Sequence, residues 1–262
     1  MFKYPIPDAD ELAMLYREGS GECWEDPVET RHDWVIARDW IWRTVERGDI
    51  LDVGCWDGSF LASLQKEDNY GLHGVELNDE AVGKAGRMGI DIVSPDFSTL
   101  RSLGDASYDV VCAFDVIEHT ENPALFLKTL SNLTRPDGYL IISSGNTEAS
   151  AWRFSRSRYW YCSIPEHISF INRTWCTAMC GQIGCSLEKI ELYSHLGRVS
   201  RKEHLRDFVK NLLYAAVPSL FVALRNFRWR QSKVQFDEKY SFPPAWASSK
   251  DHLIAVYRKH DA

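Results

Sequence analysis

The chain has 262 residues, 45% of them hydrophobic, and a net charge of −7. This length and composition are typical of one large α/β domain. The chain has no run of about 20 apolar residues, the length that a membrane-spanning helix needs. Residues 1–5 do not begin a secretory signal, and seven cysteines without paired spacing favour a reducing compartment, so we expect a cytoplasmic protein.

The charge is unevenly divided along the chain. Residues 1–150 carry 12 Lys and Arg against 28 Asp and Glu, a net charge of −16, whereas residues 151–262 carry 18 against 9, a net charge of +9. A solvated surface on both halves explains this pattern, and so does an anionic partner of the C-terminal half, such as a phosphate or a membrane surface. The overall acidity makes a nucleic-acid partner unlikely.

The first elements lead to a glycine-rich turn. Residues 1–29 form an acidic, proline-containing arm, and apolar residues at helical spacing predict a helix over residues 30–47. A strand over residues 50–54 is followed by the turn Gly54-Cys55-Trp56-Asp57-Gly58 and a helix over 58–66. Such a turn at the carboxyl end of a parallel strand is where α/β sheets bind ligands. The G-x-G-x-x-G pattern of a dinucleotide site is missing, which disfavours an NAD-linked reductase.

Two further acids follow at strand ends. A strand over residues 71–76 ends in Glu76, whose carboxylate can accept both hydroxyls of a ribose. A helix over 78–88 and a strand over 90–93 follow. In the next loop, Asp96 can accept from an adenine amino group and Phe97 can cover the ring.

The rest of the chain continues with further strands and helices. We predict strands over residues 108–114, 139–144, 185–193 and 251–257, helices over 122–134 and 172–183, and a turn over 135–138. The fourth strand is followed by the stretch from Asp115 to His119.

These motifs, taken in order, resemble those of the class I S-adenosylmethionine (SAM) methyltransferases. The glycine turn, Glu76, Asp96-Phe97, the stretch from Asp115 to His119 and Arg135-Pro136-Asp137-Gly138-Tyr139-Leu140 have the family's order and spacing over residues 34–193. The group that includes ubiquinone-pathway and sugar O-methyltransferases is the most similar. The resemblance implies a Rossmann-like sheet of seven strands with helices on both faces and an antiparallel last strand.

The resemblance also implies a SAM site. It places Asp52 at the amino group of SAM, and Gly54, Cys55, Trp56 and Gly58 along its methionine part. Glu76 with Leu77 would hold the ribose, Asp96 and Phe97 the adenine, and Asp115 would lie beside the methionyl end. Trp56 departs from the family, which often has glycine there; we expect binding to survive, with an indole near the cofactor.

Two histidines are candidates for acid–base catalysis. A base speeds methyl transfer to a hydroxyl, and a histidine suits this role near neutral pH. We therefore assign His119 and His167 as catalytic candidates. Asp115, Glu118, His119 and His167 also resemble the metal set of small-RNA 2′-O-methyltransferases, but Asp replaces the first Glu, and we assign no metal ligand.

Residues 195–248 form an insertion before the last strand. Residues 211–224 are uncharged and are followed by Arg225, Arg228, Arg230 and Lys233. This stretch is too short to span a bilayer and contains Pro218, so we expect a helical lid over the substrate pocket. The alternative is peripheral contact with an anionic membrane through residues 205–233.

The sequence thus predicts a single methyltransferase domain over residues 1–262. It comprises an arm and helix (1–48), a SAM-binding core (49–193), the insertion (195–248) and the last strand (250–258). We expect SAM-dependent O-methylation of a small-molecule or glycan-type acceptor, anionic or lipid-linked. The alternatives are a metal-assisted RNA 2′-O-methyltransferase and a catalytically idle SAM-fold module that binds a partner. The oligomeric state does not follow from the sequence.

Overall fold

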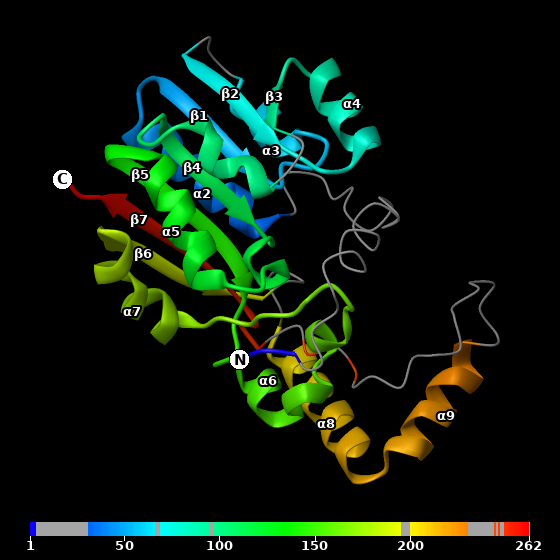
Figure 1. The fold of residues 1–262 in the computed structure, drawn as a ribbon. Helices are drawn as coiled ribbons and strands as arrows, with labels where there is room; N and C mark the ends of the chain where they lie inside the picture. The colour runs from blue at the N-terminus through cyan, green and yellow to red at the C-terminus, as the bar shows by residue number, and fades with distance from the viewer. Residues whose placement is uncertain are drawn as a thin grey trace.

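A computed structural model gives the fold (Figure 1). It describes residues 1–3, 31–65, 69–94, 97–194, 200–229, 244, 246 and 249–261, with the backbone alone at 97, 98, 163 and 225–229. The predicted arm over residues 1–29, apart from its first three residues, and Asp96 lie outside the described residues.

Seven strands form one sheet in the order β3-β2-β1-β4-β5-β7-β6. The five strands from β3 to β5 run parallel, and β7 is antiparallel to both β5 and β6, as the sequence predicts. Their bounds are β1 Gly48–Val53, β2 Tyr70–Val75, β3 Asp91–Ser94, β4 Tyr108–Phe114, β5 Thr134–Gly145, β6 Cys185–Tyr193 and β7 His252–Lys259.

Helices cover both faces of the sheet. Successive side chains of the buried strands point to opposite faces, and both sets are apolar, so each face needs a covering layer. Val110 and Cys112 of β4 pack into the core beneath α2 (His32–Thr44), α3 (Ser59–Ala62) and α4 (Asp79–Arg87). Val111 and Ala113 enter the core beneath α5 (Pro123–Leu133) and α7 (Arg173–Ile183). Between β5 and α7 lie α6 (Ser150–Ser155) and two short 3-10 helices, Arg156–Arg158 and Trp160–Ser163.

Side-chain caps fix where several helices begin. Asn78, Asn122 and Asn172 accept hydrogen bonds from backbone N–H groups in the first turns of α4, α5 and α7. Such caps satisfy donors that have no partner within the helix. The predicted starts of these helices therefore agree with the structure to within one residue.

One predicted turn lies inside the bounds of a strand. β5 begins at Thr134, and its pairing with β4 jumps from Thr134↔Tyr108 to Tyr139↔Val110. Residues 135–138 form this bulge, where Asp137 has a φ of 61°. Strand pairing on both sides of the turn extends β5 beyond the apolar stretch that predicted it.

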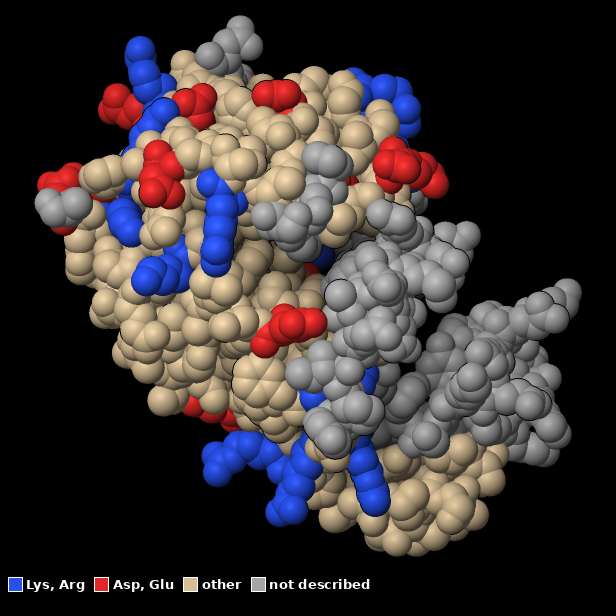
Figure 2. All heavy atoms as spheres, viewed as in Figure 1, with Lys and Arg blue, Asp and Glu red and all other residues tan. Residues whose placement is uncertain are grey.

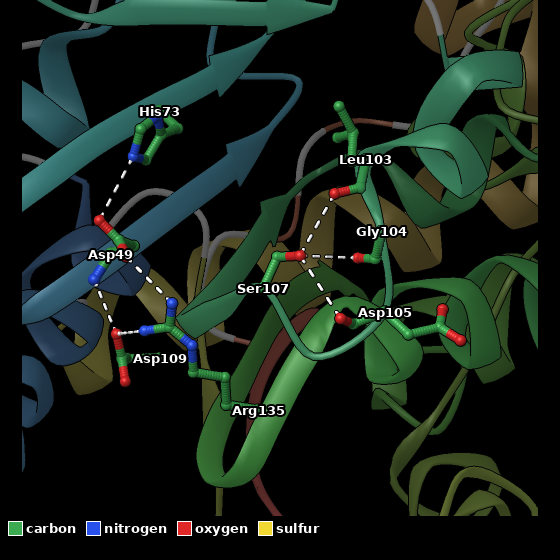
Figure 3. A network of polar contacts seen from close by, with 8 residues as sticks. All are labelled: Asp49, His73, Leu103, Gly104, Asp105, Ser107, Asp109 and Arg135. Atoms are coloured by element: carbon green, nitrogen blue, oxygen red, sulfur yellow. Dashed lines mark hydrogen bonds and ion pairs between the residues drawn. The ribbon is translucent and has the colours of Figure 1, made fainter.

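Polar contacts close the amino-terminal edge of the sheet (Figure 3). Arg135 pairs with Asp109 and, at 3.2 Å, with Asp49, and the Asp49 N–H donates to Asp109 over 2.8 Å. Because these residues come from β1, β4 and the start of β5, the contacts tie three strands together. The opposite, carboxyl edge of the sheet holds the predicted site residues.

Two helices lie between β6 and β7, within the predicted insertion. They are α8 (Arg201–Ala216) and α9 (Pro218–Trp229), and they extend from the body of the molecule beside α6 (Figure 1). In the described part of the chain, no helix has the length and apolar character needed to cross a bilayer.

Candidate active site

The glycine turn after β1 takes an unusual backbone path. Gly54, Trp56 and Gly58 have φ values of 80°, 48° and 80°. A Cβ on Gly58 would lie 3.0 Å from Ile90 and 3.1 Å from Ala85, so both the dihedral angle and the packing on α4 favour glycine. The N–H groups of Gly54 and Cys55 both bond to the carbonyl of Val75, which joins the turn to the end of β2.

Glu76 is bound to this turn and buried. Its Oε2 accepts the N–H of Trp56 at 2.9 Å, and its Oε1 accepts those of Leu77 and Asn78, both at 2.8 Å. Burial raises the pKa of Glu76, and these three hydrogen bonds oppose the rise. A carboxylate has about four acceptor sites, so Oε2 retains capacity for one further donor.

An arginine that sequence reasoning missed lies at the same edge. Arg31 pairs through Nη2 with Asp33 at 2.7 Å and with Asp115 at 2.8 Å, and its guanidinium lies 4.7 Å from the Trp34 ring. Burial raises the pKa of Asp33, but Arg31 more than offsets this and leaves the pKa below its ordinary value. Asp33 and Asp115 are 82 positions apart, and no local pattern links them.

Several buried polar atoms at this edge have no hydrogen-bond partner among the described residues. They are Asp52 Oδ1, Trp56 Nε1 and Asp115 Oδ1. Burial raises the pKa of Asp52 to about 7 despite the positive charge of Arg31. Buried polar groups are normally paired, so two carboxylate acceptors and an indole donor without partners fit a polar, partly cationic ligand. The ammonium group of SAM could donate to the two aspartates, and its carboxylate could accept from the Trp56 indole N–H.

Glu118 lies fully buried behind Asp115. Its carboxylate accepts hydrogen bonds from the Ser144 hydroxyl, at 2.8 Å, and from the Tyr161 hydroxyl. Burial and the nearby Asp115 raise the pKa of Glu118 to about 7, although both hydrogen bonds oppose the rise. The roles of Ser144 and Tyr161 were not predicted, since both belong to apolar or aromatic stretches typical of a core.

The fold brings the two candidate histidines together. The backbone N–H groups of Ile168 and Ser169 bond to the Glu118 carbonyl at 2.9 Å, which holds the loop before α7 against the 3-10 helix Ile117–His119. The rings of His119 and His167 are 4.7 Å apart.

Both rings have the same hydrogen-bonding arrangement. His119 Nδ1 contacts the Glu166 carbonyl at 3.2 Å, and His167 Nδ1 contacts the Tyr161 carbonyl at 3.0 Å. A carbonyl only accepts, so each Nδ1 carries the proton and each neutral ring presents Nε2 as an acceptor. Burial lowers the pKa of His119 to about 4 and that of His167 well below its ordinary value.

Glu118, His119 and His167 could also hold a cation, because one ligand atom from each lies within 4.8 Å of the others. Asp115, the fourth member of the set considered from the sequence, instead pairs with Arg31. Both oxygens of Glu118 already accept hydrogen bonds. These contacts weaken the metal interpretation relative to that of two neutral bases.

Asp52, Gly54, Cys55, Trp56, Gly58, Glu76, Leu77 and Asp115 all lie at the ends of β1, β2 and β4 or in the turns that follow. The backbone of Phe97 begins the 3-10 helix Phe97–Leu103 after β3. His119 and His167 lie beyond the end of β4, next to Glu118. The strand order brings these residues to one edge, because the carboxyl ends of parallel strands meet there.

The sheet order is that of the class I methyltransferase fold, and polar residues line the carboxyl edge of its parallel strands. The model of the methyltransferase domain family matches residues 35–190, and the chain belongs to this family.

Curated relatives match about half of the chain. The ubiquinone biosynthesis O-methyltransferase of Leptothrix cholodnii is 28% identical over 152 residues, which cover 53% of this chain and 64% of that protein. The protein of the same name from Aeromonas salmonicida is 30% identical over 128 residues, covering 45% and 52%. The chain thus spans about half to two thirds of the length of these relatives.

Solved structures share the fold over almost the whole chain. A SAM-dependent methyltransferase from Thermotoga maritima has a TM-score of 0.58 at 12% identity and covers 95% of this chain and all of that one. The [4+2]-cyclase SpnF has a TM-score of 0.59 at 13% identity, with coverage of 98% and 99%. Since one neighbour is a cyclase, the fold alone does not define the reaction, and the site must.

Proposed function

We propose that the protein binds SAM at the carboxyl edge of β1, β2 and β4 and methylates an oxygen of a small-molecule or glycan-type acceptor. The observation that carries this proposal is a set of buried atoms at that edge with no hydrogen-bond partner among the described residues: Asp52 Oδ1, Trp56 Nε1, Asp115 Oδ1 and His167 Nε2. The names of the curated relatives support an oxygen acceptor.

The cofactor residues divide the proposed ligand between them. Asp52 and Asp115 accept from its ammonium group, and Glu76 accepts one ribose hydroxyl through Oε2. Asp96 and Phe97 are proposed at the adenine, as the resemblance implies. SAM, when bound, supplies a methyl group on a sulfonium, which an acceptor oxygen can attack directly.

The chain's own contribution to the reaction is a base held in a fixed orientation. His167 Nδ1 donates to the Tyr161 carbonyl, which leaves Nε2 to accept the acceptor's hydroxyl proton. His119 lies beside it in the same tautomer. Glu118 and Tyr161 position the loop, and most of the rate comes from orientation of the two reactants.

A calorimetric titration tests the cofactor site. Wild-type protein should bind SAM and not NAD, and Glu76→Gln should weaken SAM binding about tenfold or more, because a charged hydrogen bond to the ribose is lost. Glu80→Gln is the matched control, since Glu80 is exposed and pairs with Lys84 on α4. Equal SAM affinities for the two variants would contradict the role of Glu76, and binding of NAD but not SAM would overturn the cofactor assignment.

A transfer assay tests the reaction separately. Methyl-labelled SAM is incubated with panels of phenols, catechols, sugars and RNA, and the labelled product identifies the acceptor class. His167→Gln should lower kcat about 100-fold or more with SAM affinity unchanged, as expected for removal of a general base. His73→Gln, at the opposite edge of the sheet, should keep full activity (Figure 3). If SAM binds but no acceptor is labelled, the protein is a SAM-binding module and the transfer proposal fails.

A further inference from the structure

Helix α8 buries polar side chains and exposes apolar ones. Its buried residues are Asp207, Asn211 and Tyr214, which lie on one face at helical spacing. The opposite face carries an apolar stripe at spacings of three and four residues: Leu205, Phe208, Val209, Leu212 and Leu213. All five are exposed, and Leu205 is 63% exposed. A surface helix normally buries its apolar stripe in the protein core, but this stripe does not pack into the core formed by the described residues.

The stripe continues on the next helix. Val217, at the junction, and Leu220 and Leu224 of α9 are 47%, 56% and 58% exposed. Among the described residues, eight of the thirteen exposed large apolar side chains therefore lie within 20 positions of the chain. Tyr214 and Phe221 pack edge to face at 5.8 Å and join the two helices into one hairpin. We call the eight exposed side chains from Leu205 to Leu224 the apolar stripe.

Positive charge borders the apolar stripe. The span of α8 and α9 carries six Lys and Arg against two acids, and one of those acids, Asp207, is buried against Arg206. The adjoining α6 region adds the exposed Arg153, Arg156 and Arg158. Figure 2 shows Lys and Arg gathered over α6 and α8, next to an uncharged surface on the hairpin.

We propose that the α8–α9 hairpin docks on an anionic lipid bilayer, with the apolar stripe buried among the acyl chains and the basic side chains at the headgroups. An outward apolar face with cationic flanks is the pattern of helices that lie in a membrane interface. The proposal concerns attachment of the protein and goes beyond its proposed reaction.

The structure argues against two other occupants of the stripe. A second copy of the chain, docked symmetrically, would bring the same basic residues together, and like charges oppose such a contact. Apart from Phe208, which contacts Trp246, the stripe is exposed and does not pack on the described body of its own chain. The opposite, polar face of α8 contacts the body through Asn211, whose side chain donates to the Pro244 carbonyl at 3.2 Å.

The hairpin connects physically to the candidate active site. Trp246 is buried and contacts Phe208 of α8 at 5.7 Å and Phe154 of α6 at 5.9 Å. It belongs to an aromatic cluster that includes Tyr161, whose hydroxyl bonds to Glu118. A docked hairpin thus brings this wall of the site close to the bilayer surface.

Vesicle sedimentation without SAM or acceptor tests the proposal independently of the reaction. The full chain is mixed with vesicles of phosphatidylcholine alone or with added phosphatidylglycerol. We expect binding to the anionic vesicles that is at least tenfold tighter than to the neutral ones and weaker at high salt. Leu205→Gln with Leu212→Gln should lose at least tenfold in partitioning, because each exposed leucine no longer enters the apolar phase.

The matched control is Met88→Gln with Leu125→Gln, which removes two exposed apolar side chains, one at the end of α4 and one on α5. This control should bind vesicles like the wild type. The proposal is overturned if the wild type stays in solution with anionic vesicles, or if both double variants lose the same affinity. Light scattering adds a third outcome: a concentration-dependent dimer abolished by the α8 variant would assign the stripe to a second copy instead.

Discussion

Trp56 adopts a backbone conformation that most residues avoid. Its φ of 48° lies in the left-handed region, between Gly54 and Gly58 with φ values of 80°. A side chain there costs roughly 1–2 kcal/mol, because Cβ approaches the following carbonyl oxygen. The Trp56 N–H donates to Glu76 at 2.9 Å, so the strained residue holds the turn against the end of β2. The dihedral angle gives a physical reason why glycine would suit this position better than tryptophan.

The strain at this position can be measured by comparing two truncations. Both Trp56→Ala and Trp56→Gly remove the indole, but only glycine also removes the Cβ. The free energy of unfolding of Trp56→Gly should therefore exceed that of Trp56→Ala by about 1 kcal/mol in urea denaturation. At Lys84, in the ordinary helix α4, the order should reverse, with alanine more stable than glycine by about 1 kcal/mol. The same order at both positions would contradict strain at Trp56.

At the scale of elements, most of the fold could be predicted because its signals are local. Buried strands such as Tyr108–Phe114 form continuous apolar runs, and Asn78, Asn122 and Asn172 mark helix starts. The order of turns and acids resembles that of the class I methyltransferases, and this resemblance implied the seven-stranded sheet and its antiparallel last strand. The bulge at residues 135–138 was missed because it depends on pairing with β4.

The sequence predicted those residues of the candidate site that lie at the end of a recognisable strand. Asp52, Glu76 and Asp115 follow apolar strands, so their common edge follows from the parallel sheet. The contacts of Arg31 with Asp115 and of Tyr161 with Glu118 join residues 84 and 43 positions apart. No periodicity carries such information, because these contacts depend on how α2 and the loop before α7 pack. The functional roles of all these residues remain predictions.

The charge division seen in the sequence corresponds to two parts of the whole molecule. The acidic half contains β1 to β5 and the proposed cofactor residues, whereas the basic half contains α6, α8 and α9 as well as α7 and the edge strands β6 and β7. At neutral pH, an anionic surface would therefore repel the first part and attract the second. The uneven charge would orient the molecule so that the α8–α9 hairpin approaches the anionic surface before the apolar stripe makes contact.

Titration at the carboxyl edge couples folding of the whole molecule to pH in two opposite directions. Burial raises the pKa of Asp52 and of Glu118 to about 7, so the folded chain retains protons that the unfolded chain loses near pH 4. Stability from these groups is lost as the pH rises towards 7. Burial lowers the pKa of His119 to about 4, so the unfolded chain is protonated first. Stability from the neutral histidine is lost as the pH falls from about 6.5 towards 4.

Single substitutions should therefore change the slope of stability against pH with opposite signs. Between about pH 4.5 and 6.5, the free energy of unfolding of Asp52→Asn should rise relative to wild type, by up to about 1.4 kcal/mol per pH unit, because the destabilising ionisation is gone. That of His119→Gln should fall relative to wild type over the same range. Urea denaturation without cofactor measures both, with the exposed Asp105→Asn as control. Curves parallel to the wild type would mean that these side chains titrate alike in the folded and unfolded chain, and the buried polar edge would then be open to water.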